Sequence, residues 1–150
     1  MSVLQTKPYM LNNEEGQFRQ ALGAAVSIKA TSEQTGGAFN LFDVSCPPDY
    51  ATPLQIHYTE DVVVYVLEGE LTFFWGGDKK AAAAGSFFYQ PRGTPHGFRV
   101  EGNTPARILY ITVPAGFDRF VLAQKFLDPQ SEPEVSAAQY KIEVLGPLPE

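Results

Sequence analysis

Short runs of apolar, β-branched and aromatic residues recur along most of this chain, with glycine, proline or aspartate between them. This pattern is typical of an all-β sandwich or barrel. It predicts eight strands, at residues 22–30, 39–45, 52–57, 62–67, 71–75, 86–90, 96–100 and 106–113. Eight strands are enough for a jelly roll, in which two sheets cover each other's inner faces.

Turn residues separate the predicted strands. Gly76-Gly77-Asp78 predicts a tight turn, because glycine reaches positive φ without a Cβ penalty. Pro47-Pro48-Asp49 and Pro91-Arg92-Gly93 are expected to end the strands beside them, since proline donates no hydrogen bond to a neighbouring strand.

The periodicity changes after Pro114. Helical spacing over residues 116–126 predicts a helix with one apolar stripe, made of Phe117, Phe120, Val121 and Gln124. A second helix is expected to begin at Ser131, which is followed by Glu134 three residues later. We therefore expect one domain over residues 1–150, with a barrel core at about 37–114 and a helical C-terminal segment at about 115–145.

The amino-acid composition argues against some classes of binding partner. The 150 residues are 44% hydrophobic and include 11 Phe and 7 Tyr, which is ample material for one core. The net charge of −6 and the absence of a basic cluster argue against nucleic acid and anionic membranes as partners. No run of 18 apolar residues occurs, and the single cysteine, Cys46, fits a reducing compartment. We expect a cytoplasmic protein.

Residues 53–69 carry the first candidate chemistry. Gln55 and His57 are two positions apart on a predicted strand, so their side chains share one face. Val62 follows five residues after His57, and Gly69 closes the segment. The other histidine of the chain, His96, lies beyond a second, glycine- and proline-marked segment.

That second segment places Gly85, Pro91, Gly93 and His96 at the spacing G-x5-P-x-G-x2-H, with Val100 where Asn would complete the pattern. With the first segment, read against H-x-H-x3-4-E-x6-G, it resembles the two motifs of the cupin superfamily. Gln55 then takes the place of the first His, and Val62 that of the Glu. Residues of about 40–148 resemble small quercetin 2,3-dioxygenase-like cupins.

The resemblance implies a double-stranded β-helix, the cupin jelly-roll barrel, with a pocket at one mouth. In metal-binding members, three His and one Glu hold the metal. The corresponding candidate ligands here are His57, His96 and Gln55, with Glu60 as a substitute for the missing carboxylate. A divalent ion such as Zn, Fe, Mn or Ni is the expected cofactor if one is bound.

The donor set also argues against a metal. Two imidazoles and an amide are neutral, so a divalent cation would keep its full charge in a medium of low dielectric constant. Glu60 lies two residues before Val62, roughly 6–7 Å along an extended strand. The alternative for Glu60 and Asp61 is a solvated acidic turn. Metal binding is therefore left open by the sequence.

Alternation predicts the rest of the pocket. Its expected lining is apolar and aromatic, which suits a flat hydrophobic organic ligand better than a sugar phosphate. The candidate pocket residues are Val62, Val64, Phe98, Ile108 and Tyr110.

Three functions remain open from the sequence. The first is a metal-dependent, quercetinase-like dioxygenase. The second is a metal-free isomerase or cyclase, in which His57 and His96 are catalytic acid and base. The third is a small-molecule binding protein without chemistry. A homodimer is also expected, since family members commonly pair through their sheets and the predicted outer positions Val63, Tyr65 and Leu67 are apolar.

Overall fold

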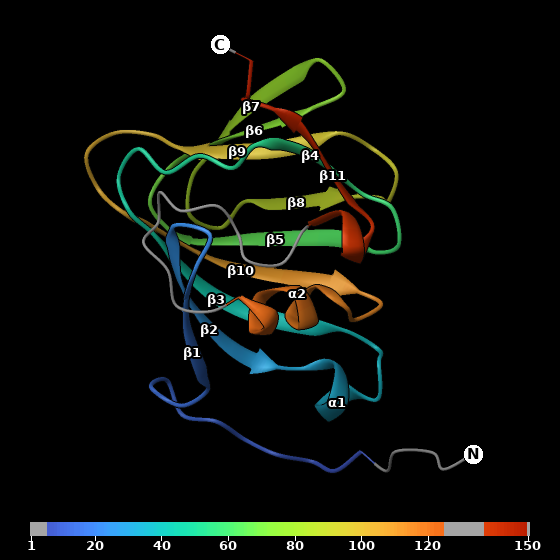
Figure 1. Cartoon of the computed structure of the whole chain (residues 1–150). Coiled ribbons are helices and arrows are strands. Elements are labelled where there is room, and N and C mark those ends of the chain that lie inside the picture. The colour runs from blue at the N-terminus through green and yellow to red at the C-terminus, as the bar shows by residue number, and fades with distance from the viewer. Residues whose placement is uncertain (1–5, 125–136, 150) are drawn as a thin grey trace.

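The computed structural model describes residues 6–124 and 137–149, and it consists of two antiparallel sheets (Figure 1). The six-stranded sheet has the order β1 (Gln17–Ala21), β2 (Ala24–Ala30), β3 (Asn40–Cys46), β10 (Ala106–Val113), β5 (Asp61–Glu68) and β8 (Phe87–Gln90). The five-stranded sheet has the order β11 (Ile142–Gly146), β4 (Leu54–His57), β9 (His96–Val100), β6 (Leu71–Trp75) and β7 (Asp78–Ala82). The predicted all-β jelly roll is confirmed.

Helices are short and lie outside the sheets. They are α1 (Ser32–Thr35), α2 (Phe117–Ala123) and the 3-10 turn η1 (Ala137–Tyr140). The described part of the helix predicted over residues 116–126 is α2. The predicted helix start at Ser131 lies outside the described residues. Within the described ranges, no helix is long and apolar enough to cross a bilayer.

Two boundaries of the sequence interpretation need correction. The C-terminal segment is not helical up to residue 145, because Ile142–Gly146 forms β11 and pairs with β4. The strand predicted over residues 22–30 begins only at Ala24. Leu22 and Gly23 have positive φ angles of 55° and 86°, and they form the turn between β1 and β2.

Glycines close two of the turns. Gly76 and Gly77 join β6 to β7 with φ angles of 51° and 87°, and Trp75 pairs with Asp78 across this predicted turn. Gly69 joins β5 to β6 with φ of 87°, and a Cβ there would lie 2.8 Å from the Cα of Ala106. Only glycine fits this close approach, which accounts for the glycine that ends the first motif.

The core lies between the sheets, on the inward positions of alternating strands. Its fully buried side chains include Phe42, Val62, Val64, Val66, Leu71 and Ile108. The outer face of β5 and β8 leaves Tyr65, Phe87 and Tyr89 exposed by 41%, 64% and 52%. The homodimer expected through Val63, Tyr65 and Leu67 stays a prediction.

Candidate functional site

Two imidazoles from different strands meet between the sheets. His57 ends β4 and His96 begins β9, and these neighbouring strands are paired through Gln55 and His96. The ring centroids are 5.3 Å apart, and both side chains are buried, with 1% and 4% exposure. The structure therefore brings together two histidines that lie 39 positions apart in the sequence.

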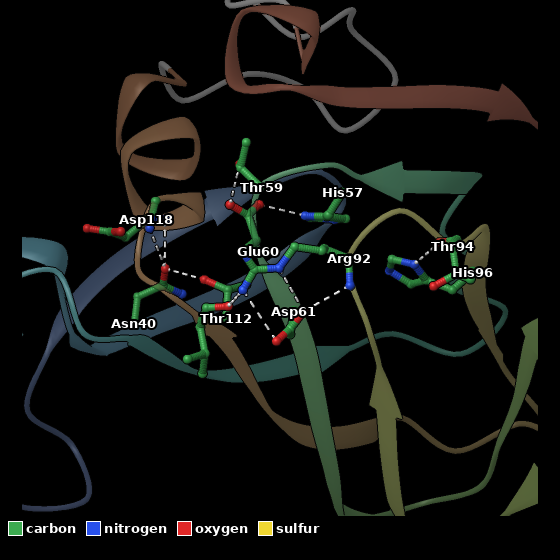
Figure 2. A network of polar contacts seen from close by, with 12 residues as sticks. Asn40, His57, Thr59, Glu60, Asp61, Arg92, Thr94, His96, Thr112 and Asp118 are labelled. Carbon is green, nitrogen blue, oxygen red and sulfur yellow. Dashed lines mark hydrogen bonds and ion pairs between the residues drawn. The ribbon is translucent and has the colours of Figure 1, made fainter.

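Each imidazole has an oxygen partner at Nδ1 (Figure 2). His57 Nδ1 is 2.7 Å from Glu60 Oε1, and Thr59 Oγ1 donates to the other carboxylate oxygen at 3.2 Å. His96 Nδ1 is 3.3 Å from the carbonyl oxygen of Thr94. A carbonyl can only accept a hydrogen bond, so His96 Nδ1 carries the hydrogen. In the neutral tautomers that donate from Nδ1, each Nε2 has a free lone pair.

Neither of these lone pairs is used by the residues that the structure describes. The Nε2 atoms of His57 and His96 are both buried and have no hydrogen-bond partner among residues 6–124 and 137–149. Buried polar atoms are rarely left unpaired in folded proteins, so an unpaired one invites a functional explanation. Burial and the neighbouring His57 lower the pKa of His96 from 6.5 to about 4. His96 is therefore neutral at pH 7.

The structure contradicts one of the two alternatives considered for Glu60, the solvated acidic turn. Glu60 is 4% exposed, so it is not part of a solvated acidic turn. One oxygen is engaged with His57 Nδ1, the position where a carboxylate orients a ligating or catalytic histidine. The adjacent Asp61 does lie near the surface, where it pairs with Arg92 at 3.0 Å. That pairing lowers the pKa of the Asp61 carboxyl.

A cavity of about 1000 Å³ lies beside the histidines, walled by both sheets and by α2. Apolar and aromatic groups dominate its lining, among them Phe42, Val44, Phe98, Ile108, Tyr110 and Phe117. Neither histidine lines the cavity. Phe117 lies next to both the cavity and the histidine pair. It lines the cavity, and its ring meets the His57 ring edge-on, with 5.1 Å between the ring centroids.

The structure divides the predicted pocket residues into two groups. Phe98, Ile108 and Tyr110 line the cavity, as does Gln55, which was considered as a metal ligand. Val62 and Val64 are 1% and 2% exposed and belong to the core beyond the lining.

Buried polar residues that the sequence analysis did not single out hold Phe117 in place. Asn40 is fully buried, and its Oδ1 accepts hydrogen bonds from Thr112 Oγ1 at 2.5 Å and from the Gly116 amide at 3.1 Å (Figure 2). It also accepts from the Asp118 amide at 3.4 Å. These bonds fix the chain on both sides of Phe117. No periodic pattern marks Asn40, because its role depends on loops that are distant in sequence.

Asp118 connects the same segment of the chain to α1. Its carboxylate is 2% exposed and accepts from the Ser32 amide at 2.7 Å and from Ser32 Oγ at 2.5 Å. Hydrogen bonds to a charged group are the stronger ones, and leaving a buried carboxylate oxygen unpaired is costly. The pair therefore ties α2, which forms part of the cavity wall, to the start of α1.

Replacing Ser32 by alanine is expected to lower the free energy of unfolding by about 2 kcal/mol, because the hydroxyl bond to Asp118 is lost while the amide bond stays. Chemical denaturation of wild type and variant measures this loss. Ser45→Ala, on the exposed face of β3, is the control and should change stability by less than about 0.5 kcal/mol. Equal effects of the two substitutions would contradict the anchoring role of Ser32.

The donor set does not complete a metal centre. His57 and His96 offer two nitrogen ligands with suitable Nδ1 partners, but catalytic zinc sites use three protein ligands. Val62 replaces the carboxylate of the motif, and Glu60 is engaged with His57. Among the described residues, no group of three or more His, Cys, Asp or Glu side chains is placed to hold an ion.

Comparisons with known proteins agree with the barrel. The family model for the cupin domain matches residues 42–112. Quercetin 2,3-dioxygenase of Bacillus subtilis is 29% identical over 104 residues, which are 69% of this chain and 31% of that enzyme. The chain thus spans less than a third of the length of this relative.

Solved structures show the same fold. KdgF from a Halomonas species superposes with a TM-score of 0.65 at 18% identity, over 75% of this chain and 99% of KdgF. The polyketide cyclase RemF from Streptomyces resistomycificus superposes with a TM-score of 0.63 at 20% identity, over 71% of this chain and 80% of RemF. At these identities the similarity extends to the fold alone.

Proposed function

Because this chain belongs to the cupin superfamily, which places ligands inside the barrel, we propose that it binds a flat, apolar organic molecule of aromatic type in its cavity. The observation that carries the proposal is the cavity itself, about 1000 Å³ with mainly apolar walls. Ligand pockets of ~300–1,000 Å³ with apolar walls and few polar groups suit small organic ligands. The net charge of −6 further disfavours sugar phosphates.

Isothermal titration with naphthalene-type probes and with a sugar phosphate tests this proposal. We expect the aromatic probes to bind and the sugar phosphate to give no heat of binding. Val44 lines the cavity from β3, so Val44→Trp should fill space and weaken probe binding by roughly tenfold or more. Ser45 is exposed on the same strand, and Ser45→Trp is the matched control. No probe binding, or equal effects of both substitutions, would overturn the proposal.

A second candidate function is metal-free proton transfer, as in an isomerase or a cyclase. It is supported by the 2.7 Å contact between His57 Nδ1 and Glu60, which leaves His57 Nε2 free to accept a proton. Glu60 would stabilise the imidazolium that forms. Since His57 does not line the cavity, substrate would reach it only after displacement of the Phe117 ring. Retained turnover in His57→Gln would exclude this function.

Oxygenation of the quercetinase type is not supported by the side chains. That chemistry depends on a bound metal. The described residues supply two nitrogen ligands, from His57 and His96, but no free carboxylate to complete the set. The proposed function therefore rests on the cavity.

A further inference from the structure

Tyr110 lines the cavity and carries a hydroxyl group. Its side chain comes from β10, is 8% exposed and packs against Phe42 at 6.3 Å and Phe117 at 5.5 Å between ring centroids. Phe42 and Phe117 are themselves 5.9 Å apart, so the three rings form one packed cluster. The hydroxyl group has no hydrogen-bond partner among the residues that the structure describes.

The other two tyrosines that line the cavity, Tyr50 and Tyr58, do have hydrogen-bond partners for their hydroxyl groups. Tyr50 donates its hydroxyl hydrogen to the Leu22 carbonyl oxygen at 3.1 Å. Tyr58 donates to Glu143 Oε1 at 2.6 Å. Both hydroxyl groups are therefore satisfied within the fold, and Tyr110 is the lining tyrosine whose hydrogen-bonding capacity is left for a ligand.

The surroundings keep this hydroxyl protonated. Burial, together with the negative charge of Glu60, raises the pKa of Tyr110 well above its usual range. A neutral phenol can donate one hydrogen bond. A ligand oxygen that meets this hydroxyl group therefore gains one hydrogen bond.

From this geometry we propose that the ligand carries an oxygen atom, phenolic or carbonyl, that accepts a hydrogen bond from Tyr110. Tyr110 is then the residue that distinguishes oxygenated aromatic molecules from plain hydrocarbons of the same shape. The inference rests on the proposed binding of an aromatic molecule in the cavity, and it narrows the chemical class of that molecule.

The test combines two ligands with two proteins. 2-Naphthol and 2-methylnaphthalene have similar shapes, but only the first has an oxygen. Their dissociation constants are measured by titration for wild type and for Tyr110→Phe. We expect the substitution to weaken 2-naphthol relative to 2-methylnaphthalene by about tenfold, which corresponds to one hydrogen bond. Binding of 2-methylnaphthalene itself should persist in the variant.

Tyr50→Phe is the matched control, since its hydroxyl is already bonded to Leu22. It should change the affinities for both ligands by the same factor. If Tyr110→Phe also changes both affinities equally while both ligands bind wild type, the role of Tyr110 is overturned and the proposed function stands. If neither ligand binds wild type, the proposed function fails and this inference falls with it.

Discussion

Replacing Val62 by glutamate is expected to turn the histidine pair into a zinc site. Val62 stands where the cupin motif has its carboxylate ligand, and it follows two residues after Glu60, whose carboxylate reaches His57. The substitution would add a carboxylate to two imidazoles whose Nε2 atoms have no partner in the described part of the chain. Two His and one Glu form a known ligand set for catalytic zinc.

The effect on stability should depend on zinc. Without metal, a carboxyl group at this position, where the native side chain is 1% exposed, is expected to lower the free energy of unfolding by roughly 3 kcal/mol. Zinc at about 100 times its dissociation constant would restore about 2.7 kcal/mol by binding only the folded state. Denaturation with and without zinc measures both changes, and elemental analysis after dialysis gives the occupancy.

Wild type and Val62→Gln are the controls for this experiment. Wild type, purified without a tag and without added metal, should hold far less than one metal ion per chain. Val62→Gln has a side chain of the same length without the charge, so zinc should stabilise it much less. A second substitution, His96→Asn, should abolish the gain. Two outcomes would contradict the prediction. One is a wild-type protein with about one metal ion per chain, and the other is a Val62→Glu variant that zinc does not stabilise.

The chain's chemistry follows from the absence of that carboxylate. A buried divalent ion needs negative charge near it, and Val62 provides none. What remains is a mainly apolar interior, in which the buried carboxylates of Glu60 and Asp118 are paired with His57 and Ser32. This interior favours binding by burial of apolar surface, with orientation set by one or two hydrogen bonds.

The strands that the sequence predicts are those with an apolar inner face. β5 alternates between buried and half-buried or exposed positions, and it was expected at residues 62–67 and is observed at Asp61–Glu68. The strands that were missed lack this pattern. β7 has almost only exposed residues and lies at the edge of its sheet, and four of the five residues of β1 are exposed. Such edge strands are held by backbone hydrogen bonds, which leave little trace in the order of side chains.

The candidate site was predictable only in part. Motif spacing predicted that His57 and His96 come together from different strands, and the structure places them on the paired strands β4 and β9. Alternation predicted inward positions for Phe98, Ile108 and Tyr110. The partner of His57 was not predictable, because a side chain three residues away reaches it only through the turn between β4 and β5. The position of Phe117, which lines the cavity and contacts His57, was not predictable either, because it is set by hydrogen bonds from Asn40, far away in sequence.

The free energy of unfolding should decrease at acidic pH, because His96 is buried. In the fold, burial and the neighbouring His57 lower its pKa to about 4, whereas an unfolded chain has the ordinary value of 6.5. Between these pH values the unfolded state binds a proton that the folded state does not, so stability falls as the pH falls. The contribution of His96 is fully present above pH 6.5, and about 3 kcal/mol of it is lost by pH 4.

Comparison with His96→Asn isolates this contribution. The asparagine amide can still donate to the Thr94 carbonyl but does not titrate. Asp61 and Glu101, whose pKa values are lowered by arginine partners, also lose stabilising interactions in acid, but both proteins share them. Urea unfolding at pH 7, 5.5 and 4 should therefore show the stability difference between the two proteins shifting by about 3 kcal/mol towards the variant. Parallel curves would mean that His96 is protonated as readily in the fold as in water, and hence is not buried between the sheets.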